Sequence, residues 1–130
     1  MEIEKSGLLS GKWDGAGHQV KVKVPLIAFH EDNCFIIYCP VFDLSGYGKT
    51  ESEAELSLHT AMNEFFTYTV HKNTLRSVLK DLGWVVKKSK HKPMTPPTMD
   101  DLLRNNEDFL RIFNKHEFRK FDKNIEIPVC

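Results

Sequence analysis

The chain has 130 residues with 18 acidic and 18 basic side chains, so its formal net charge is zero when histidine is neutral. This balance excludes a strong overall attraction to nucleic acid or to anionic membranes. A hydrophobic content of 41% and a charged content of 28% are ordinary for a globular domain with its own core. The charge is uneven, because residues 1–86 carry 8 basic and 11 acidic side chains and residues 87–130 carry 10 and 7. The C-terminal part is therefore expected to be attracted to the rest of the chain or to an acidic partner.

The first seven residues, MEIEKSG, lack the apolar core of a signal peptide, and no apolar run approaches the length of a membrane span. We therefore expect no membrane segment and a cytoplasmic location. Three cysteines, Cys34, Cys39 and Cys130, fit a reducing compartment. Cys34 and Cys39 lie in one apolar strand pattern and are expected to be small buried residues on opposite sheet faces, without a disulfide between them.

Three strands are predicted before the first helix. The first runs from Gln19 to His30, where valines alternate with lysines. Pro25 within it cannot donate a ladder hydrogen bond, which indicates an edge position or a bulge. The second, Cys34 to Cys39, is apolar on both faces and is predicted to be central. The short polar turn between these two strands requires an antiparallel pair, and Val41 to Leu44 is predicted to be the third strand.

A long amphipathic helix is predicted from Glu51 to His71, because Thr50 and Glu53 fit a capping box at its start. Its apolar stripe is expected to contain Ala54, Leu58, Ala61, Met62, Phe65 and Tyr68. A second, short helix follows Asn73 and Thr74 and ends at Gly83. Trp84 to Val86 is predicted to be a short strand.

The boundary of the first domain is predicted at Lys87 to Pro97, where a basic run meets three prolines. Thr98 with Asp101 then marks the start of a helix whose stripe extends to Phe113. A short helix through Phe118 and Phe121 and a final strand at Ile125 to Val129 are expected after it.

The expected fold class is α+β: a small antiparallel sheet in the order β-β-β-α-α-β with a helix packed on one face. The expected domain organisation is an α+β domain at 1–88, a linker at 89–97 and a helix–strand arm at 98–130. This arm cannot bury its apolar stripe alone, so it is expected to dock on the first domain or to mediate oligomerisation.

The sequence disfavours four kinds of catalytic or cofactor site. The GKT of Gly48–Thr50 lacks the earlier glycine of a phosphate loop, since Asp43 stands there. The two strand cysteines have apolar surroundings, unlike a reactive thiol. Most of the carboxylates around the turn are explained by the dipole of the helix start, and the strands supply almost none of the carboxylates that a two-metal site needs. The six histidines, without metal-ligand spacing, are His18, His30, His59, His71, His91 and His116. We therefore expect no enzyme activity, cofactor or metal.

Two groups of basic residues are candidates for contact with nucleic-acid phosphates. The first is the run in the linker, for which a solvated segment is the commoner structure, and the second would require a recognition helix in the tail. Together they comprise Lys87, Lys88, Lys90, Lys92, Lys115, Arg119 and Lys120.

The middle of the chain follows a recognisable order: an apolar strand, a proline, a short loop ending in Gly-x-Thr, and Glu-Ala opening a helix. The residues that carry this order are Pro40, Gly46, Gly48, Thr50, Glu53 and Ala54. Over roughly Val20 to Val86 the chain resembles the HicB-like antitoxin family. The resemblance implies a non-enzymatic antitoxin that binds and neutralises a small HicA-like toxin, which cleaves messenger RNA.

Many members of this family also repress their own promoter through a C-terminal DNA-binding domain. The predicted tail runs helix, short helix, strand, which differs from a ribbon-helix-helix domain. We therefore expect weak autoregulatory DNA binding at most, and a tail that supports a homo-oligomer. Two alternatives remain: an orphan HicB-like module that binds another protein or RNA without a toxin, and an enzyme whose cleft the sequence does not reveal.

Overall fold

The computed structural model describes residues 8–9, 18–86, 94–115 and 117–129. Its main sheet has the order β1-β7-β2-β3-β4, and among these strands only β1 is parallel to its neighbour. The strands of this sheet are β1 (Leu8–Leu9), β2 (His18–Glu31), β3 (Cys34–Cys39), β4 (Leu44–Gly48) and β7 (Phe118–Val129).

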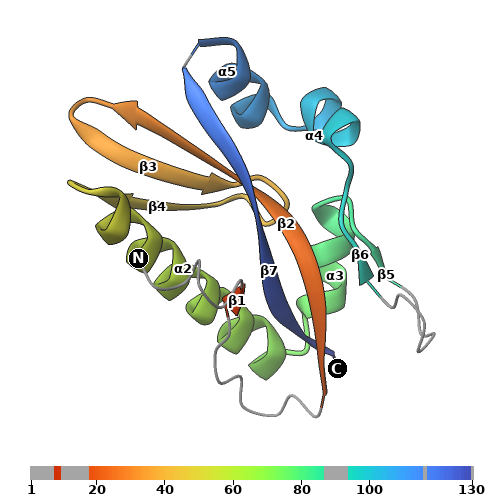
Figure 1. Ribbon diagram of the computed structural model, residues 1–130. Helices are drawn as coiled ribbons and strands as arrows, with labels where there is room; N and C mark the ends of the chain where they lie inside the picture. Colours follow the sequence, from red (N-terminus) through yellow and green to blue (C-terminus); the bar gives the residue numbers. More distant parts are fainter. Residues whose placement is uncertain (1–7, 10–17, 87–93, 116, 130) are drawn as a thin grey trace.

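Helices cover both faces of this curved sheet, and a small hairpin lies beside it (Figure 1). These elements are α2 (Glu51–His71), α3 (Leu75–Asp81), α4 (Met99–Asn105) and α5 (Glu107–Lys115), with β5 (Val85–Val86) paired to β6 (Met94–Thr95). The fold class is α+β, as predicted, and β6 falls inside the predicted linker. No helix of the described residues is both long and apolar enough to cross a membrane.

The turn between β2 and β3 determines which residues of β2 point their backbone N–H and C=O groups toward β3 and which point them toward β7. Asp32 and Asn33 both have positive φ, 51° and 63°, as in a type I′ hairpin turn. Glu31 and Cys34 flank this turn and lie opposite each other, so they form the hydrogen-bonded pair. By alternation, the backbone of odd-numbered β2 residues faces β3 and that of even-numbered residues faces β7.

This alternation explains why β2 tolerates Pro25. Residue 25 is odd-numbered, so the N–H that Pro25 lacks would point toward the β3 side. On that side β3 pairs with β2 at Ile27–Glu31, beyond the proline. Pro25 therefore lies on an edge on that side, as predicted, while it lies opposite Asp122 of β7 on the other. The proline also ensures that the first half of β2 cannot pair fully with another strand.

The helix α2 approaches β4 most closely at Gly46. A Cβ atom there would lie 2.1 Å from the carbonyl oxygen of Ala54 and 2.3 Å from the backbone nitrogen of Leu58. Gly46 lies opposite Ile37, which is fully buried on the same face of the sheet. Only a residue without a side chain allows the helix to lie directly on the strand.

The apolar stripe of α2 is shifted relative to the prediction. Ala54, Leu58 and Met62 are buried as predicted, but Tyr68 is 63% exposed and its assignment to the stripe is wrong. The remaining buried apolar residues of α2 are Phe66 and Val70. The stripe follows these positions because the C-terminal half of α2 packs on an aromatic cluster formed with Phe42, 5.2 Å from Phe66 between ring centroids.

The prediction of a strand at Val41 to Leu44 is wrong, because residues 40–43 form a turn and β4 begins at Leu44. Asp43 has a φ of 54°, a conformation that aspartate tolerates better than most residues. The buried Phe42 ring stacks on Trp84 at 5.2 Å, and Trp84 Nε1 donates a hydrogen bond to the Val41 carbonyl at 2.7 Å. The apolar residues of this turn therefore anchor the end of α3 instead of extending the sheet.

Gly83 ends α3 as predicted. Its φ is 96°, and its N–H donates to the Lys80 carbonyl at 3.0 Å while the Trp84 N–H donates to the Leu79 carbonyl at 2.9 Å. This pair of bonds defines a Schellman motif, which brings Trp84 back toward the buried side chain of Leu79.

The helix predicted from Thr98 is in fact two helices, α4 and α5. Thr98 and Asp101 form the predicted capping box at the start of α4. The helix breaks at Asn106, whose side-chain oxygen accepts the Phe109 N–H at 3.0 Å and so caps α5. The break lets α4 and α5 each bury apolar side chains, namely Leu102 of α4 and Phe109 and Ile112 of α5.

The prediction of a short helix through Phe118 and Phe121 is also wrong. Residues 118–129 form one strand, β7, which pairs antiparallel with β2 from Phe118 opposite Phe29 to Val129 opposite His18. The predicted final strand, Ile125 to Val129, is its second half. Pairing along the whole of β2 outweighs the local helical spacing of the two phenylalanines, and it places the end of the tail inside the main sheet.

Candidate partner-docking groove

A hydrogen-bonded contact joins the sheet to the α4–α5 junction. Tyr38 of β3 donates from Oη to Asp43 Oδ1 at 2.6 Å, and Asn106 Nδ2 donates to Tyr38 Oη at 2.8 Å. Because Asn106 also caps α5, one side chain fixes the start of this helix and ties it to the strand. Tyr38 lies on the opposite face of β3 from Ile37, so α5 and α2 cover opposite faces here.

Two hollows flank this contact. The larger has a volume of about 530 Å³ and lies between the β3–β4 turn, the end of α3 and the α4–α5 junction. The smaller, about 440 Å³, lies between α5 and the face of β3 and β4 that bears Tyr38. Asp43 and Asp108 line both hollows, so the Tyr38 contact divides what is otherwise one groove.

Carboxylates dominate the rim of this groove, which we name the acidic groove. It is defined by Asp43, Asp81, Asp101, Glu107 and Asp108 in the larger hollow, with Glu31 added in the smaller one. Arg111 contributes a basic side chain to the smaller hollow. Apolar side chains lie between the carboxylates, with Leu82 and Pro97 on one side and Ile36 and Tyr47 on the other.

Part of this charge has a structural cause. Asp101, Glu107 and Asp108 lie in the first turns of α4 and α5, where the helix dipole favours carboxylates. The Thr98 backbone N–H and hydroxyl lower the pKa of Asp101, and Arg104 is 3.1 Å from its carboxylate. Asp43 instead accepts the Tyr38 hydroxyl at 2.6 Å, and Asp81 lies at the C-terminal end of α3, where the helix dipole does not favour a carboxylate.

Replacing Tyr38 with phenylalanine tests the contact that divides the groove. Burial, and then the hydrogen bond to Asp43, raise the pKa of Tyr38 above its ordinary value of 10.0, so the phenol remains a donor. Tyr38→Phe is expected to lower the free energy of unfolding by about 1–2 kcal/mol at neutral pH. That difference shrinks as pH rises above 10, because the unfolded tyrosine then ionises while the folded one does not. Urea unfolding of both proteins at neutral pH and at a pH above 10 measures the difference in their free energies of unfolding. A difference that does not change with pH would contradict the raised pKa of Tyr38.

The six family-motif residues come together where β3, β4 and α2 meet. Thr50 Oγ1 accepts the Glu53 N–H at 3.1 Å, which confirms the predicted helix cap. The Glu53 carboxylate accepts the Lys49 N–H at 3.2 Å rather than that of Thr50, so the reciprocal bond of the capping box is displaced by one residue. Pro40 and Ala54 are buried, and Gly48 lies so close to α2 that a Cβ atom on it would be 2.4 Å from the Glu53 Cβ.

Of the candidate nucleic-acid contacts, the structure describes three, and these three come from two different elements. Lys87, Lys88, Lys90 and Lys92 lie outside the described residues. Lys115 ends α5, whereas Arg119 and Lys120 are successive residues of β7 and face opposite sides of the sheet. The described part of the tail therefore does not form the recognition helix that these three residues would need.

Arg119 and Lys120 also have acidic neighbours. Arg119 forms an ion pair with Glu51 and lies over the Phe121 ring at 5.0 Å. Lys120 forms an ion pair with Asp122 at 3.2 Å. Both basic side chains are therefore paired with carboxylates of the same chain, Glu51 of α2 and Asp122 of β7.

The thiols that could serve catalysis are held in structural positions. Burial raises the pKa of the Cys39 thiol to about 12, so it is almost entirely protonated at neutral pH. Cys34 and Cys39 are both free thiols, and Cys34 is half-buried rather than buried. Within the described ranges, no group of three or more histidine, cysteine, aspartate or glutamate side chains is arranged to hold a metal ion.

The central residues of the groove, Tyr38 and Asn106, were not predicted from the sequence. Asn106 carried a usable signal, since an asparagine followed by Glu107 and Asp108 is typical of a helix start. Tyr38 carried none, because its partner Asn106 is distant in sequence and reaches it only when α5 packs on the sheet.

Comparison with known proteins adds no relative: no protein-family model, no curated protein and no solved structure matches this chain.

Proposed function

We propose that the chain is a HicB-like antitoxin that acts in the cytoplasm and neutralises a small, basic, HicA-like toxin that cleaves messenger RNA. The observation that carries the proposal is the acidic groove, in which carboxylates from the β3–β4 turn, the end of α3 and the starts of α4 and α5 lie around a few apolar side chains. The arrangement of the family-motif residues at the start of α2 supports it independently, because the same order of strand, glycine loop and capped helix carries the resemblance.

The chemistry of such a toxin suits this groove. A protein that binds messenger RNA presents lysines and arginines to the phosphates. A rim of carboxylates attracts that surface, raises the rate of encounter and disfavours acidic competitors. The apolar side chains between the carboxylates add to the contact area, and a partner seated there would hold its basic surface away from RNA.

Binding to any small basic protein that a neighbouring gene encodes tests the proposal, and the absence of such a gene would favour the orphan module. The double variant Glu107→Gln, Asp108→Asn removes two carboxylates at the α5 side of the groove while keeping the shape of both side chains. We expect its Kd for that protein to rise about tenfold at low salt and less at high salt. The matched control is Glu64→Gln on the exposed side of α2, which should leave the Kd unchanged. Calorimetric titration at two salt concentrations gives both values.

Two outcomes would count against the proposal in different ways. If the purified chain forms no complex with that protein and does not relieve its toxicity on co-expression, the antitoxin function is wrong. If a complex forms but the double variant binds as tightly as the natural chain, the function stands and the acidic groove is not its docking surface.

A further inference from the structure

The smaller hollow of the acidic groove reaches the outer edge of β4. Its lining includes Ala61 of α2 as well as Asp108 and Arg111 of α5. Because α2 and α5 cover opposite faces of the sheet here, a hollow lined by both helices opens at the edge of the strand between them. That strand is β4, the last strand of the main sheet on this side (Figure 1).

The backbone of β4 presents hydrogen-bonding groups at this edge. The N–H of Tyr47 points away from β3, because it donates to Ser57 Oγ of α2 at 3.1 Å. Backbone direction alternates along a strand, so the N–H and C=O of Ser45, two residues earlier, also point outward. Within the described part of the chain, no backbone group bonds to Ser45 from outside the sheet. The helix α2 therefore occupies the outward N–H of Tyr47 and leaves both outward groups of Ser45 to a further strand.

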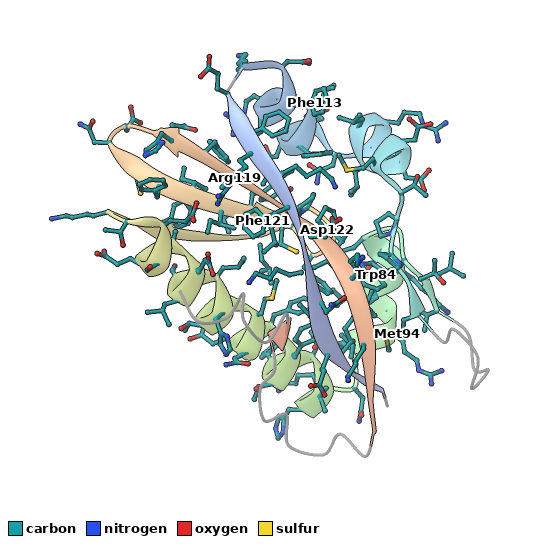
Figure 2. All side chains as sticks on the ribbon, in the orientation of Figure 1. Trp84, Met94, Phe113, Arg119, Phe121 and Asp122 are labelled. Carbon is teal, nitrogen blue, oxygen red and sulfur yellow. The ribbon has the colours of Figure 1, made fainter. Side chains whose placement is uncertain are left out.

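The β4 edge is remote from the other edge of the sheet. The order β1-β7-β2-β3-β4 places two strands between β7 and β4. Figure 2 labels Arg119, Phe121 and Asp122 along β7, on the β1 side of the sheet. The residues that adjoin positions 1–7 and 10–17 belong to β1 and to the far end of β2, so the hollow at β4 lies on the opposite side of the sheet from them.

We propose that the edge of β4 pairs with an extended segment of a basic partner protein, which lies antiparallel to β4 in the smaller hollow. Addition of a strand to an exposed sheet edge is a recurrent mode of peptide recognition, in which the main chain gives affinity and the side chains give specificity. The identity of the partner rests on the proposed function, whereas the strand edge and its charges do not.

Ser45 fixes the register of this pairing. In an antiparallel pair, a residue with both backbone groups directed outward exchanges two hydrogen bonds with the residue opposite it, and the two side chains share a face of the sheet. Ser45 lies opposite Tyr38 and so belongs to the α5 face. Asp43 and Asp108 line the hollow on this face, so we expect the partner residue opposite Ser45 to be basic.

The neighbours of that basic residue point to the other face of the sheet, where Ala61 lines the hollow. We expect these two residues to be apolar and β-branched, as suits a half-buried strand. Arg111 follows Asp108 by about one helical turn and disfavours a second basic residue on the α5 face. The recognised segment is therefore one basic residue between two apolar residues, followed on each side by a neutral polar residue.

A synthetic peptide with this pattern, acetyl-Thr-Val-Lys-Val-Thr-amide, is the probe. It reads the same in both directions, so the strand direction does not change the side chains that it presents. Its lysine N–H would bond to the C=O of Ser45, whereas the N–H groups of its valines point away. In an NMR titration of the isotope-labelled full chain, we expect the amide signal of Ser45 to shift with a Kd of about 1 mM or below.

Backbone methylation of the probe tests the strand pairing. Methylation of the lysine nitrogen removes the donor to Ser45, and we expect the Kd to rise at least about tenfold. The matched control carries the methyl group on the first valine nitrogen and should bind as the unmodified probe does. Replacing the lysine of the probe with glutamate should also raise the Kd about tenfold at low salt, because of Asp43 and Asp108.

Substitution of Ser45 tests the same bonds from the side of the protein. Ser45→Pro removes the outward N–H, and proline is tolerated on an edge strand. Ser45→Ala is the matched control, because it removes the same hydroxyl and keeps the N–H. We expect the alanine variant to bind the probe as the natural chain does and the proline variant not to bind it. Circular dichroism checks that both variants are folded, and the methylated probes decide the question if the proline variant is not.

The inference is overturned if the probe does not shift the Ser45 signal, if both methylated probes bind equally, or if a folded Ser45→Pro variant binds as the natural chain does. The probe needs no natural partner, so the two proposals fail separately. Binding of the probe without any complex with a neighbouring gene's product would leave the strand site standing and the proposed function wrong. A complex with that product that is equally tight for natural Ser45 and for a folded proline variant would leave the function standing and overturn the strand site.

Discussion

Replacing Gly46 with alanine is expected to destabilise the protein far more than the addition of one methyl group to a surface residue would. The new Cβ would lie 2.1 Å from the Ala54 carbonyl oxygen and 2.3 Å from the Leu58 nitrogen, and both are backbone atoms that cannot rotate away. The helix α2 must then move off β4, which exposes the residues buried beneath it. We expect a loss of about 3 kcal/mol or more, and a fall in Tm of at least about 10 °C in a thermal melt.

Gly83→Ala is the control for this prediction, because it adds the same methyl group to a glycine that lies outside the sheet. Its nearest neighbour would be the ring of Pro97 at 3.4 Å, and the cost comes from a φ of 96°. We expect a loss of only about 1–2 kcal/mol. If Gly46→Ala is tolerated as well as Gly83→Ala, α2 does not lie on β4 as described.

Replacing Trp84 with alanine is the second change expected to have a large effect. Its indole is buried, stacks on Phe42 at 5.2 Å and donates to the Val41 carbonyl at 2.7 Å. It thereby connects the end of α3 to the β3–β4 turn that carries Asp43. We expect a loss of about 3–5 kcal/mol from the cavity and the lost contacts, measured by urea denaturation.

Trp84→Phe separates the hydrogen bond from the packing. Phenylalanine keeps a ring against Phe42 but leaves the Val41 carbonyl without its donor, so we expect an intermediate loss of about 1–3 kcal/mol. Equal losses for phenylalanine and alanine would mean that the hydrogen bond, rather than the stacking, dominates the contribution of this residue.

Elements with strong local patterns could be predicted from the sequence. The helix from Glu51 to His71 has a threonine cap, a first-turn glutamate and a regular apolar stripe, and its predicted bounds agree with α2. The strand from Cys34 to Cys39 was equally well marked, because an apolar run between polar turns leaves little choice of bounds.

The errors fall where distant residues decide the local structure. Val41 and Phe42 look like strand residues, but Trp84 and the end of α3 hold them in a turn. Phe118 and Phe121 have helical spacing, but the open side of β2 pairs with them as a strand. Such outcomes depend on tertiary contacts, which a local pattern does not contain.

The candidate site could be predicted only in part. The family-motif residues, such as Gly46 and Thr50, were found because the turn and the helix cap have local sequence signals. The acidic groove was not found, since its carboxylates come from separate segments of the chain and meet only when α4 and α5 pack beside the β3–β4 turn.

The pairing of β2 with β7 has a consequence for how the protein is made. These strands stand near opposite ends of the chain, yet they are neighbours along most of their length. Closing so long a loop is slow, and the sheet cannot be completed until residues 118–129 have been translated and have left the ribosome. Until then the backbone groups of β2 that point toward β7 have no partner strand. A growing chain therefore presents an unpaired strand edge, the kind of edge that favours aggregation, for most of its synthesis.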